Sequence, residues 1–414
     1  MAIGTAPLHG SPRTAHPQSA RRSAQTPPTE TRRAGPPPVR DTFEPHLGSP
    51  IRQRELIGLP AETRQHIIRR SETSPEYASA ARTALRGSTG AQRLQLGRVL
   101  GEASPQGARD LAALGPSRLS SRDSRGQTML SNLDRLATAP LDRRLDGWSR
   151  QQLVDGALAD TARPQTITQG AAGSCGVTSV FQPLARDQPA EYARISADLA
   201  TSGRAQLRGG RGSSDIGPQM GNTLELVRAA PPQLSDALRD ENRSATSRIL
   251  QNAGLENANG PHATYDPERD RHSWGGSGVM VGQPGALASQ LYGTRYGVQR
   301  FEGDGAPGPG AAEGVLRAAL ARSSAAAGPV IADVRLRDGG SHAIEVQRLA
   351  NGVATVRDPN GAQGAGGFPA QVSGATATAE PGVYTIPVSA LASRLRAVEA
   401  PAAPPAELVE RVPR

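Results

Sequence analysis

The chain has 414 residues and a formal net charge of +9, and only 3% of its residues are aromatic. This length predicts two or three domains, while 47 glycines and 35 prolines predict that part of the chain is loop or disordered. All 47 basic residues are arginines interleaved with acidic residues, and no basic run carries aromatic side chains, so the composition argues against a specific nucleic-acid groove.

The single cysteine, Cys175, excludes an intrachain disulfide. No apolar run is long enough for a membrane span, and the N-terminus lacks the apolar core of a secretory signal peptide. The seven histidines are scattered along the chain and show no metal-ligand spacing. We therefore expect no cofactor, no metal and no membrane span.

Residues 1–50 are rich in proline, serine, threonine and arginine, and the first acidic residue is Glu30. Such a segment cannot bury enough apolar surface to order itself, so a disordered leader is expected. It resembles the acid-poor leaders of type III secretion effectors. That resemblance implies an export signal, delivery into a host cell, and a secretion chaperone as a partner of the N-terminal region. The absence of lysine, the usual attachment site of ubiquitin, would suit this setting.

Residues 51–162 predict a helical region of four to six short helices. Two of its segments begin with Ser-Pro, at residues 74–75 and 104–105, and each places a capping hydroxyl before a proline in the first turn. Nothing in the region carries evident chemistry, so we expect a bundle or a lid.

Residues 163–398 predict a mixed domain. A helix follows Cys175, and a Gly-rich stretch of loops and short helices over 203–284 is expected to be an insertion. A strand, a helix and three further strands follow, and a last strand leads into a helix predicted over 389–400. A disordered tail is expected over 399–414.

The segment Gly173-Ser174-Cys175-Gly176 has the form of a nucleophile at the start of a helix. A thiol becomes nucleophilic when its surroundings favour the thiolate, and the free amides of a helix N-terminus do so while also offering hydrogen bonds to an oxyanion. Gln169, six residues upstream, could donate a second oxyanion hydrogen bond. Pro183 predicts that this helix ends or kinks after two turns.

Gln169, the short Gly/Ala loop and the Gly-Ser-Cys-Gly run resemble the active-site segment of the papain-like cysteine peptidases. The order of a helix, an apolar strand, His342 at a strand start and Asp358 after the next strand resembles the C39-type branch most. The resemblance implies an α+β fold, in which a helical lobe carries the cysteine and an antiparallel sheet carries the histidine and the aspartate. It makes Cys175 the nucleophile, His342 the general base and acid, Asp358 the group that orients the imidazole, and Gln169 the oxyanion donor. It also implies a protein or peptide substrate.

The strand pattern provides a separate argument for the pairing of His342 with Asp358. On both predicted strands, 341–349 and 352–358, the even-numbered residues are the ones expected to be buried. A two-residue turn would pair even with odd residues, whereas a three-residue turn over 350–352 with a bulge pairs even with even. That register sets Asp358 diagonal to His342, at about 7–8 Å between backbones and within side-chain reach.

Other interpretations of these residues stay open. A lone cysteine is most often a buried small residue, and His342 could be a satisfied core histidine. The run Asp358-Pro359-Asn360-Gly361 consists of turn formers, so Asn360 could orient the imidazole in place of Asp358.

Further motifs are weaker. His262 and His272 are rival bases, but both are predicted in loops. Residues 303–308 match a G-x-G-x-x-G dinucleotide fingerprint, although Pro307 removes an amide from the loop, so a plain loop is the better interpretation. A serine hydrolase with a G-x-S-x-G motif needs a second glycine two residues after its nucleophile. Ser277 lacks it, because the glycine directly follows the serine.

The sequence therefore predicts a cysteine peptidase that hydrolyses peptide or amide bonds and is secreted as an effector. The same triad also supports a deamidase or a transglutaminase, and the residues do not separate these activities. The alternatives from other classes are a non-enzymatic scaffold that keeps the fold, and an arginine-based nucleic-acid binder with steep salt dependence. By analogy with C39-type enzymes the substrate would contain a glycine pair.

Overall fold

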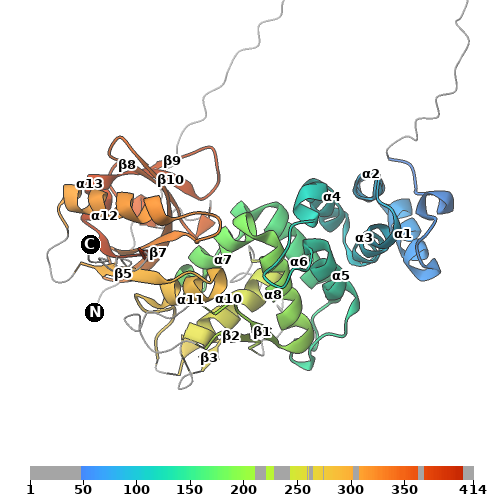
Figure 1. The fold of residues 1–414 in the computed structure, drawn as a ribbon, viewed down its shortest axis with the longest axis horizontal. Helices are drawn as coiled ribbons and strands as arrows, with labels where there is room; N and C mark the ends of the chain where they lie inside the picture. Colours follow the sequence, from blue (N-terminus) through green and yellow to red (C-terminus); the bar gives the residue numbers. More distant parts are fainter. Residues whose placement is uncertain are drawn as a thin grey trace, which may run out of the picture. The chain divides into compact units, whose positions relative to one another are not determined.

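Helices form the first part of the chain and an antiparallel sheet forms the last part, so the fold is α+β (Figure 1). The computed structural model describes residues 48–209, 221–227, 243–258, 260, 264–273, 275–301, 307–361 and 368–403. The chain divides into two units, residues 1–45 and 46–414, and the second is described below. The predicted leader lies outside the described residues except for 48–50.

The region predicted to be helical is helical. Its helices are η1 (Gln53–Leu56), α1 (Ala61–Thr73), α2 (Pro75–Leu85), α3 (Gly90–Glu102), α4 (Pro105–Leu119), α5 (Met129–Thr138), η2 (Arg143–Leu145) and α6 (Arg150–Ala162). Both predicted Ser-Pro caps form, because the hydroxyls of Ser74 and Ser104 accept the backbone N–H groups of Tyr77 and Gly107.

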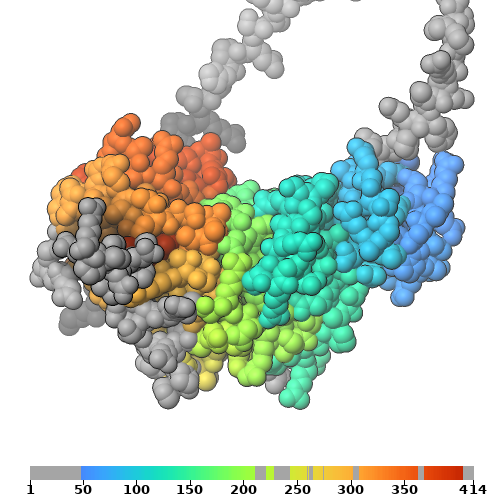
Figure 2. Space-filling view, viewed as in Figure 1, coloured from blue at the N-terminus to red at the C-terminus, as the bar shows by residue number. Residues whose placement is uncertain are grey.

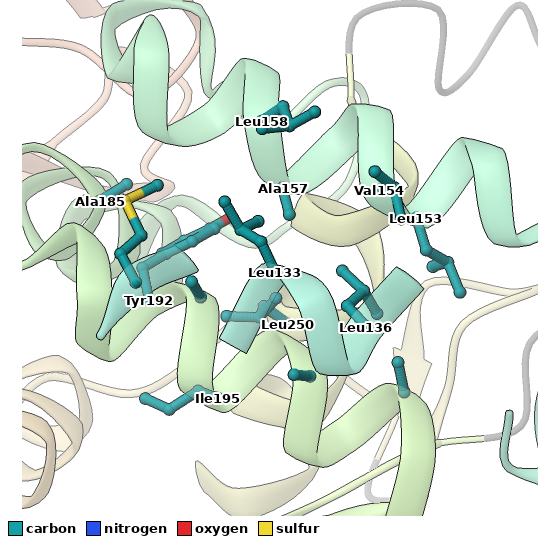
Figure 3. Close-up of a cluster of buried hydrophobic side chains, with 14 of the residues drawn as sticks. Leu133, Leu136, Leu153, Val154, Ala157, Leu158, Ala185, Tyr192, Ile195 and Leu250 are labelled. Atoms are coloured by element: carbon teal, nitrogen blue, oxygen red, sulfur yellow. The ribbon is translucent and has the colours of Figure 1, made fainter. Parts of the chain in front are cut away.

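These helices are continuous with the ones that follow, which are η3 (Pro164–Thr166), α7 (Cys175–Asp187), α8 (Pro189–Ser202), α10 (Ala245–Ala258) and α11 (Gln283–Tyr292). Leu133 of α5, Ala157 of α6, Tyr192 of α8 and Leu250 of α10 share one buried apolar cluster (Figure 3). In the space-filling view, the teal residues of the first region lie directly against the green residues that follow them (Figure 2). The boundary predicted between residues 162 and 163 therefore runs through a single core.

The stretch predicted as an insertion is also more integral than its composition suggested. Its described residues contain two two-stranded antiparallel sheets, β1 (Arg204–Gln206) with β2 (Thr223–Glu225) and β3 (Tyr265–Asp266) with β4 (Arg271–His272). It also contains α10, a helix of 14 residues that packs against α6, α7 and α8. Ile249, Leu250 and Leu255 of this helix are buried in the main core, so residues 203–284 include one of the central helices.

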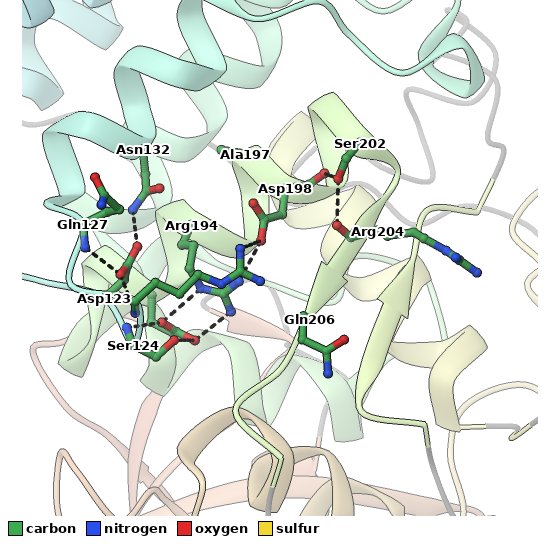
Figure 4. A network of polar contacts seen from close by, with 12 residues as sticks. Asp123, Ser124, Gln127, Asn132, Arg194, Ala197, Asp198, Ser202, Arg204 and Gln206 are labelled. Carbon is green, nitrogen blue, oxygen red and sulfur yellow. Dashed lines mark hydrogen bonds and ion pairs between the residues drawn. The ribbon is translucent and has the colours of Figure 1, made fainter.

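A buried ionic network fixes α8 (Figure 4). Arg194 is 1% exposed, and its guanidinium bonds Glu191 at 2.8 Å and Asp198 at 2.7 Å on the same helix. Asp198 also pairs with Arg135 of α5, and Glu191 accepts the backbone N–H of Ser124. A buried arginine is tolerated only when its donors are paired, and this pairing joins α5 and the preceding loop to α8.

The sheet has seven antiparallel strands in the order β5-β11-β6-β7-β8-β10-β9. They are β5 (Tyr296–Arg300), β6 (Val330–Arg335), β7 (Ser341–Ala350), β8 (Val353–Arg357), β9 (Thr376–Ala377), β10 (Val383–Pro387) and β11 (Leu395–Pro401). A second apolar core lies between one sheet face and the helices α12 (Pro309–Arg322) and α13 (Val388–Ala392), with η6 (Phe368–Gln371) beside them. The opposite face contacts α7 and α11.

The C-terminal prediction was wrong in two respects. The helix expected over 389–400 is only the short α13, and β11 follows it and pairs with both β5 and β6. Val398 and Ala400 belong to the second core while Glu399 lies on the opposite face, so the segment alternates as a strand does. Residues 399–401 of the predicted disordered tail therefore belong to a strand, and residues 404–414 lie outside the described part of the chain.

The register between β7 and β8 was predicted correctly at the site but for the wrong reason. The turn has two residues, Asn351 and Gly352, both with positive φ (50° and 72°), and Ala350 pairs with Val353. A bulge between Val346 and Arg348 supplies the extra residue instead, and beyond it Glu345 pairs with Arg357. Continued by one step, this register places Asp358 opposite Ile344, as expected.

The polar, odd-numbered face of these strands is buried as well, which the alternation did not predict. Glu345 and Arg357 are each 3% exposed. Arg186 of α7 bonds Glu345 at 2.8 Å, and Arg357 pairs with Glu380. An ionic network therefore joins α7 to the sheet. None of the helices in the described part of the chain is long and apolar enough to cross a membrane.

Candidate active site

Helix α7 begins at Cys175, as the sequence predicted. Ser174 occupies the N-cap position, but its hydroxyl does not cap the helix and donates instead to Oε1 of Gln251 at 2.8 Å. Pro183 lies inside the helix, which continues to Asp187, so the helix does not end there. Cys175 is half-buried at the edge of the main core. Its thiol is thus held by the helix without being sealed in apolar packing.

The structure brings His342 and Asp358 together. His342 lies on β7 and is 5% exposed, while Asp358 follows the end of β8 and is 1% exposed. Nε2 of His342 is 2.9 Å from Oδ1 of Asp358, which also accepts the backbone N–H of Asn360. Asn360 therefore supports the aspartate through its backbone, and the carboxylate holds the ring.

The Cys175 thiol lies close enough to His342 to change the ionisation of the ring. Burial lowers the pKa of His342, but hydrogen bonding and electrostatic interactions with Asp358 and Cys175 outweigh burial and raise it to about 10. Since Nε2 is bonded to Asp358, Nδ1 is the nitrogen left for the thiol. At neutral pH the ring carries a proton, which is the state that favours a thiolate beside it.

One aromatic ring lies beside His342, and a buried carboxyl lies on the neighbouring strand β6. The Phe368 ring lies 6.4 Å from that of His342, centroid to centroid. Asp333 of β6 is buried, and burial raises its pKa, although a hydrogen bond from Ser341 lowers it in part. Val334 is the β6 residue that pairs with His342, whereas Asp333 pairs with Ala343, and Asp358 is the carboxylate bonded to Nε2.

Gln169 lies in the loop before Cys175, but its amide is turned back on that loop. Its Nε2 donates to the carbonyl of Ala172 at 2.9 Å, and Oε1 is buried with no hydrogen-bond partner among the described residues. Its backbone N–H donates to the carbonyl of Pro359 at 2.8 Å. Gln169 therefore connects the nucleophile loop to the residues after Asp358, and among its described contacts none is with Cys175.

A feature that the sequence did not indicate lies on the other side of this loop. The backbone N–H of Gly173 donates to Oδ2 of Asp270 at 2.8 Å, and the Tyr265 hydroxyl donates to Oδ1 at 2.7 Å. The two bonded partners Gly173 and Asp270 are 97 residues apart in the chain. The only local signal is an aspartate in a turn between two short polar strands.

Of the two rival bases, His272 is among the described residues. His272 lies on β4, where burial lowers its pKa and Nε2 forms a hydrogen bond with the Gly278 carbonyl. His262 lies outside the described residues, as does most of the glycine-rich 303–308 segment. No cluster of His, Cys, Asp and Glu within the described parts of the chain has the form of a metal site.

Comparison with known proteins identifies no relative. No protein family matches the chain, and neither a curated protein nor a solved structure matches it. The interpretation of the site therefore rests on its geometry.

Proposed function

We propose that the chain is a cysteine peptidase of the papain-like kind, which hydrolyses a peptide or amide bond by acyl transfer through Cys175. The observation that carries the proposal is the chain of a buried carboxylate, a buried imidazole and a half-buried thiol, in which Asp358 holds Nε2 of His342 and Cys175 interacts with the same ring. These three residues come from α7, β7 and the segment after β8, and no packing requirement explains a buried, protonated histidine between an acid and a thiol.

In the proposed reaction, the Cys175 thiolate attacks the carbonyl carbon and the carbonyl oxygen becomes an oxyanion. The backbone N–H of Cys175 at the start of α7 donates to this oxygen, and the Gln169 amide is the second donor once it turns away from the Ala172 carbonyl. The His342 imidazolium then protonates the leaving amine, so the C–N bond breaks and a thioester remains. Neutral His342 next removes a proton from water, which displaces the sulfur and releases the acid.

A protein or peptide substrate fits this chemistry. The same steps on a side-chain amide give deamidation, and the same steps with an amine in place of water as the acceptor give transglutamination. The Ser/Pro-rich composition of residues 1–50 supports a secreted effector, with this segment as the export signal and a chaperone as its partner. Neither the export signal nor the chaperone depends on the chemistry at Cys175.

Trapping with a small epoxide tests the proposal. Ring opening needs both a thiolate and a nearby proton donor, so the wild-type protein should be modified at Cys175 much faster than a free cysteine at the same pH. His342→Ala should slow the modification by about 100-fold or more. His66→Ala on α1 is the matched control, because it removes an imidazole far along the chain from the sheet, and it should leave the rate unchanged.

A slow modification that is indifferent to His342 would show that the triad is not active, and would favour a scaffold that retains the fold. A rapid, His342-dependent reaction followed by release of a peptide fragment from a substrate library supports hydrolysis. Incorporation of an added amine in place of water would assign transglutamination instead.

A further inference from the structure

The segment made of residues 264–273 and 275–282, which contains β3 and β4, packs on the loop that leads into the nucleophile. Asp270 is at its centre and adopts a left-handed backbone conformation, with φ at 48°. This conformation is uncommon for residues other than glycine, though aspartate tolerates it better than most. In it the two carboxylate oxygens receive the Gly173 N–H and the Tyr265 hydroxyl separately.

The same segment also encloses Gly173 from a second direction. A methyl group added at Gly173 would lie 2.9 Å from the backbone nitrogen of Gly278 and 3.0 Å from Cβ of Ser277. A methyl group at Gly278 would in turn lie 2.7 Å from the Gly173 carbonyl oxygen. Both backbones therefore lie in close contact, and only glycine fits at either position.

The segment is itself held by side chains from its own two strands. The rings of Tyr265 and His272 are 5.1 Å apart, and Nε2 of His272 forms a hydrogen bond with the Gly278 carbonyl. Asp270 and Gly278, which contact Gly173 from two directions, are thus both bonded to this ring pair. Through Asp270 and Gly278, the position of the β3–β4 hairpin therefore determines the position of Gly173 in the loop.

The loop needs such a support because its own side chains provide little. Between Gln169 and Ser174 it consists of Gly170, two alanines and Gly173, and Gly170 has a φ of 60°. Small residues with such backbone freedom lose more entropy on ordering than others. Gly173 is two residues before Cys175, whose N–H is the proposed oxyanion donor. A displacement of about 1 Å at such a donor costs on the order of 100-fold in rate.

We propose that Asp270 is a positioning residue for the reaction at Cys175: it fixes the Gly173 amide and thereby orients the first oxyanion donor. The inference rests on the proposed function, because it assigns Asp270 a role in that reaction. It does not place Asp270 in contact with the substrate. Asp270 acts through the backbone from Gly173 to Cys175.

The test separates the oxyanion site from the thiolate. Alkylation by iodoacetamide needs only a thiolate, whereas acetyl-glycinal forms a hemithioacetal whose oxygen occupies the oxyanion site. The aldehyde's affinity is measured as protection of Cys175 from iodoacetamide in the full-length protein. Hydrogen exchange of the 168–178 peptide reports the order of the loop independently of any activity.

The variants are Asp270→Ala, Asp270→Asn and the control Asp266→Asn, which lies on the same hairpin but bonds the amides of Glu268 and Arg269. Asp270→Ala should weaken aldehyde binding about tenfold or more, change the alkylation rate less than about threefold, and accelerate exchange in the loop. Asparagine tolerates the left-handed conformation and keeps one acceptor, so the aldehyde affinity of Asp270→Asn should fall between those of Asp270→Ala and wild type. This variant also provides the comparison if the alanine variant is poorly folded. The control should match wild type.

Suppose that Cys175 of the wild type is reactive. If Asp270→Ala then loses aldehyde binding and alkylation equally, or changes neither, the positioning role is overturned and the proposed function is not. Unchanged exchange in Asp270→Ala would overturn the positioning role as well. A wild-type Cys175 that reacts no faster than free cysteine and does not bind the aldehyde would refute the proposed function, and the role of Asp270 with it.

Discussion

Replacing Asp358 with asparagine tests whether His342 needs a negative charge behind it. Oδ1 of Asp358 accepts from the ring and from the Asn360 N–H, while Oδ2 is buried with no hydrogen-bond partner among the described residues. An asparagine can keep its oxygen at the Oδ1 position and place its NH₂ group where Oδ2 lies. Asp358→Asn therefore removes the charge and retains both hydrogen bonds.

The size of the effect follows from the change in one bond. A hydrogen bond to a charged partner contributes about 1.5–3 kcal/mol and a neutral one about 1 kcal/mol, so the imidazolium loses about 1–2 kcal/mol of stabilisation. One pKa unit corresponds to about 1.4 kcal/mol. The pKa of His342, about 10 in the wild type, should accordingly fall by about one unit in Asp358→Asn.

The assay is the rate of epoxide modification of Cys175 as a function of pH. The rate falls at alkaline pH when the imidazolium that protonates the opening epoxide is lost, so the midpoint of this limb reports the pKa of His342. Asp358→Asn should move the midpoint toward neutral pH. Asp338→Asn removes an exposed carboxylate from the turn before β7 and should not move it. A midpoint that stays in place or moves upward in Asp358→Asn would refute the assignment of Asp358.

Three further predictions concern the sheet that carries the site. Gly352→Ala places a side chain at a φ of 72° in the turn and should lower the free energy of unfolding in urea by about 1–2 kcal/mol. Glu345→Gln removes the buried carboxylate that bonds Arg186 at 2.8 Å and should cost about 3 kcal/mol, whereas Glu313→Gln breaks only an exposed pair and should cost less than about 1 kcal/mol. Burial raises the pKa of Glu399 to about 7, so the folded state holds a proton that the unfolded chain releases near 4.5. The stability of the wild type relative to Glu399→Gln should therefore fall as the pH rises from about 4.5 to 7 and level off above it, as denaturation at several pH values will show.

Local patterns in the sequence were sufficient for the parts of the site that depend on one or two adjacent elements. The start of α7 at Cys175 follows from the Gly-Ser-Cys run, and the pairing of His342 with Asp358 follows from alternation on two neighbouring strands. The position of the extra residue was missed, although the sequence carries a sign of it. Apolar residues stand at 344 and 346 and then at 349, and this spacing of three marks the bulge.

Contacts between distant segments left no such sign. Arg186 and Glu345 are 159 residues apart, and each belongs to a pattern that looks solvent-exposed when read alone. Alternation on β7 identifies which residues share a face, but it does not show that a helix covers the polar face as well. The same applies to α10, whose glycine- and asparagine-rich surroundings hid a helix at the centre of the main core.

The geometry of the triad depends on the interface between α7 and β7, because the sheet register fixes His342 and Asp358 but not Cys175. The hydroxyl of Ser179 bonds a β7 carbonyl at 3.2 Å, and Arg186 bonds a β7 carboxylate at 2.8 Å. At 1.5 Å per residue, these points lie about 6 Å and 17 Å along the axis from Cys175. Two attachments on one side of a helix fix its distance from the sheet, but neither lies at the start of the helix. The bond from Asp270 to the loop before Cys175 lies at that end. Loss of the Ser179 or Arg186 bond should therefore shift the sulfur relative to the ring, whereas loss of the Asp270 bond should displace the loop and the Cys175 amide, in each case without unfolding either core.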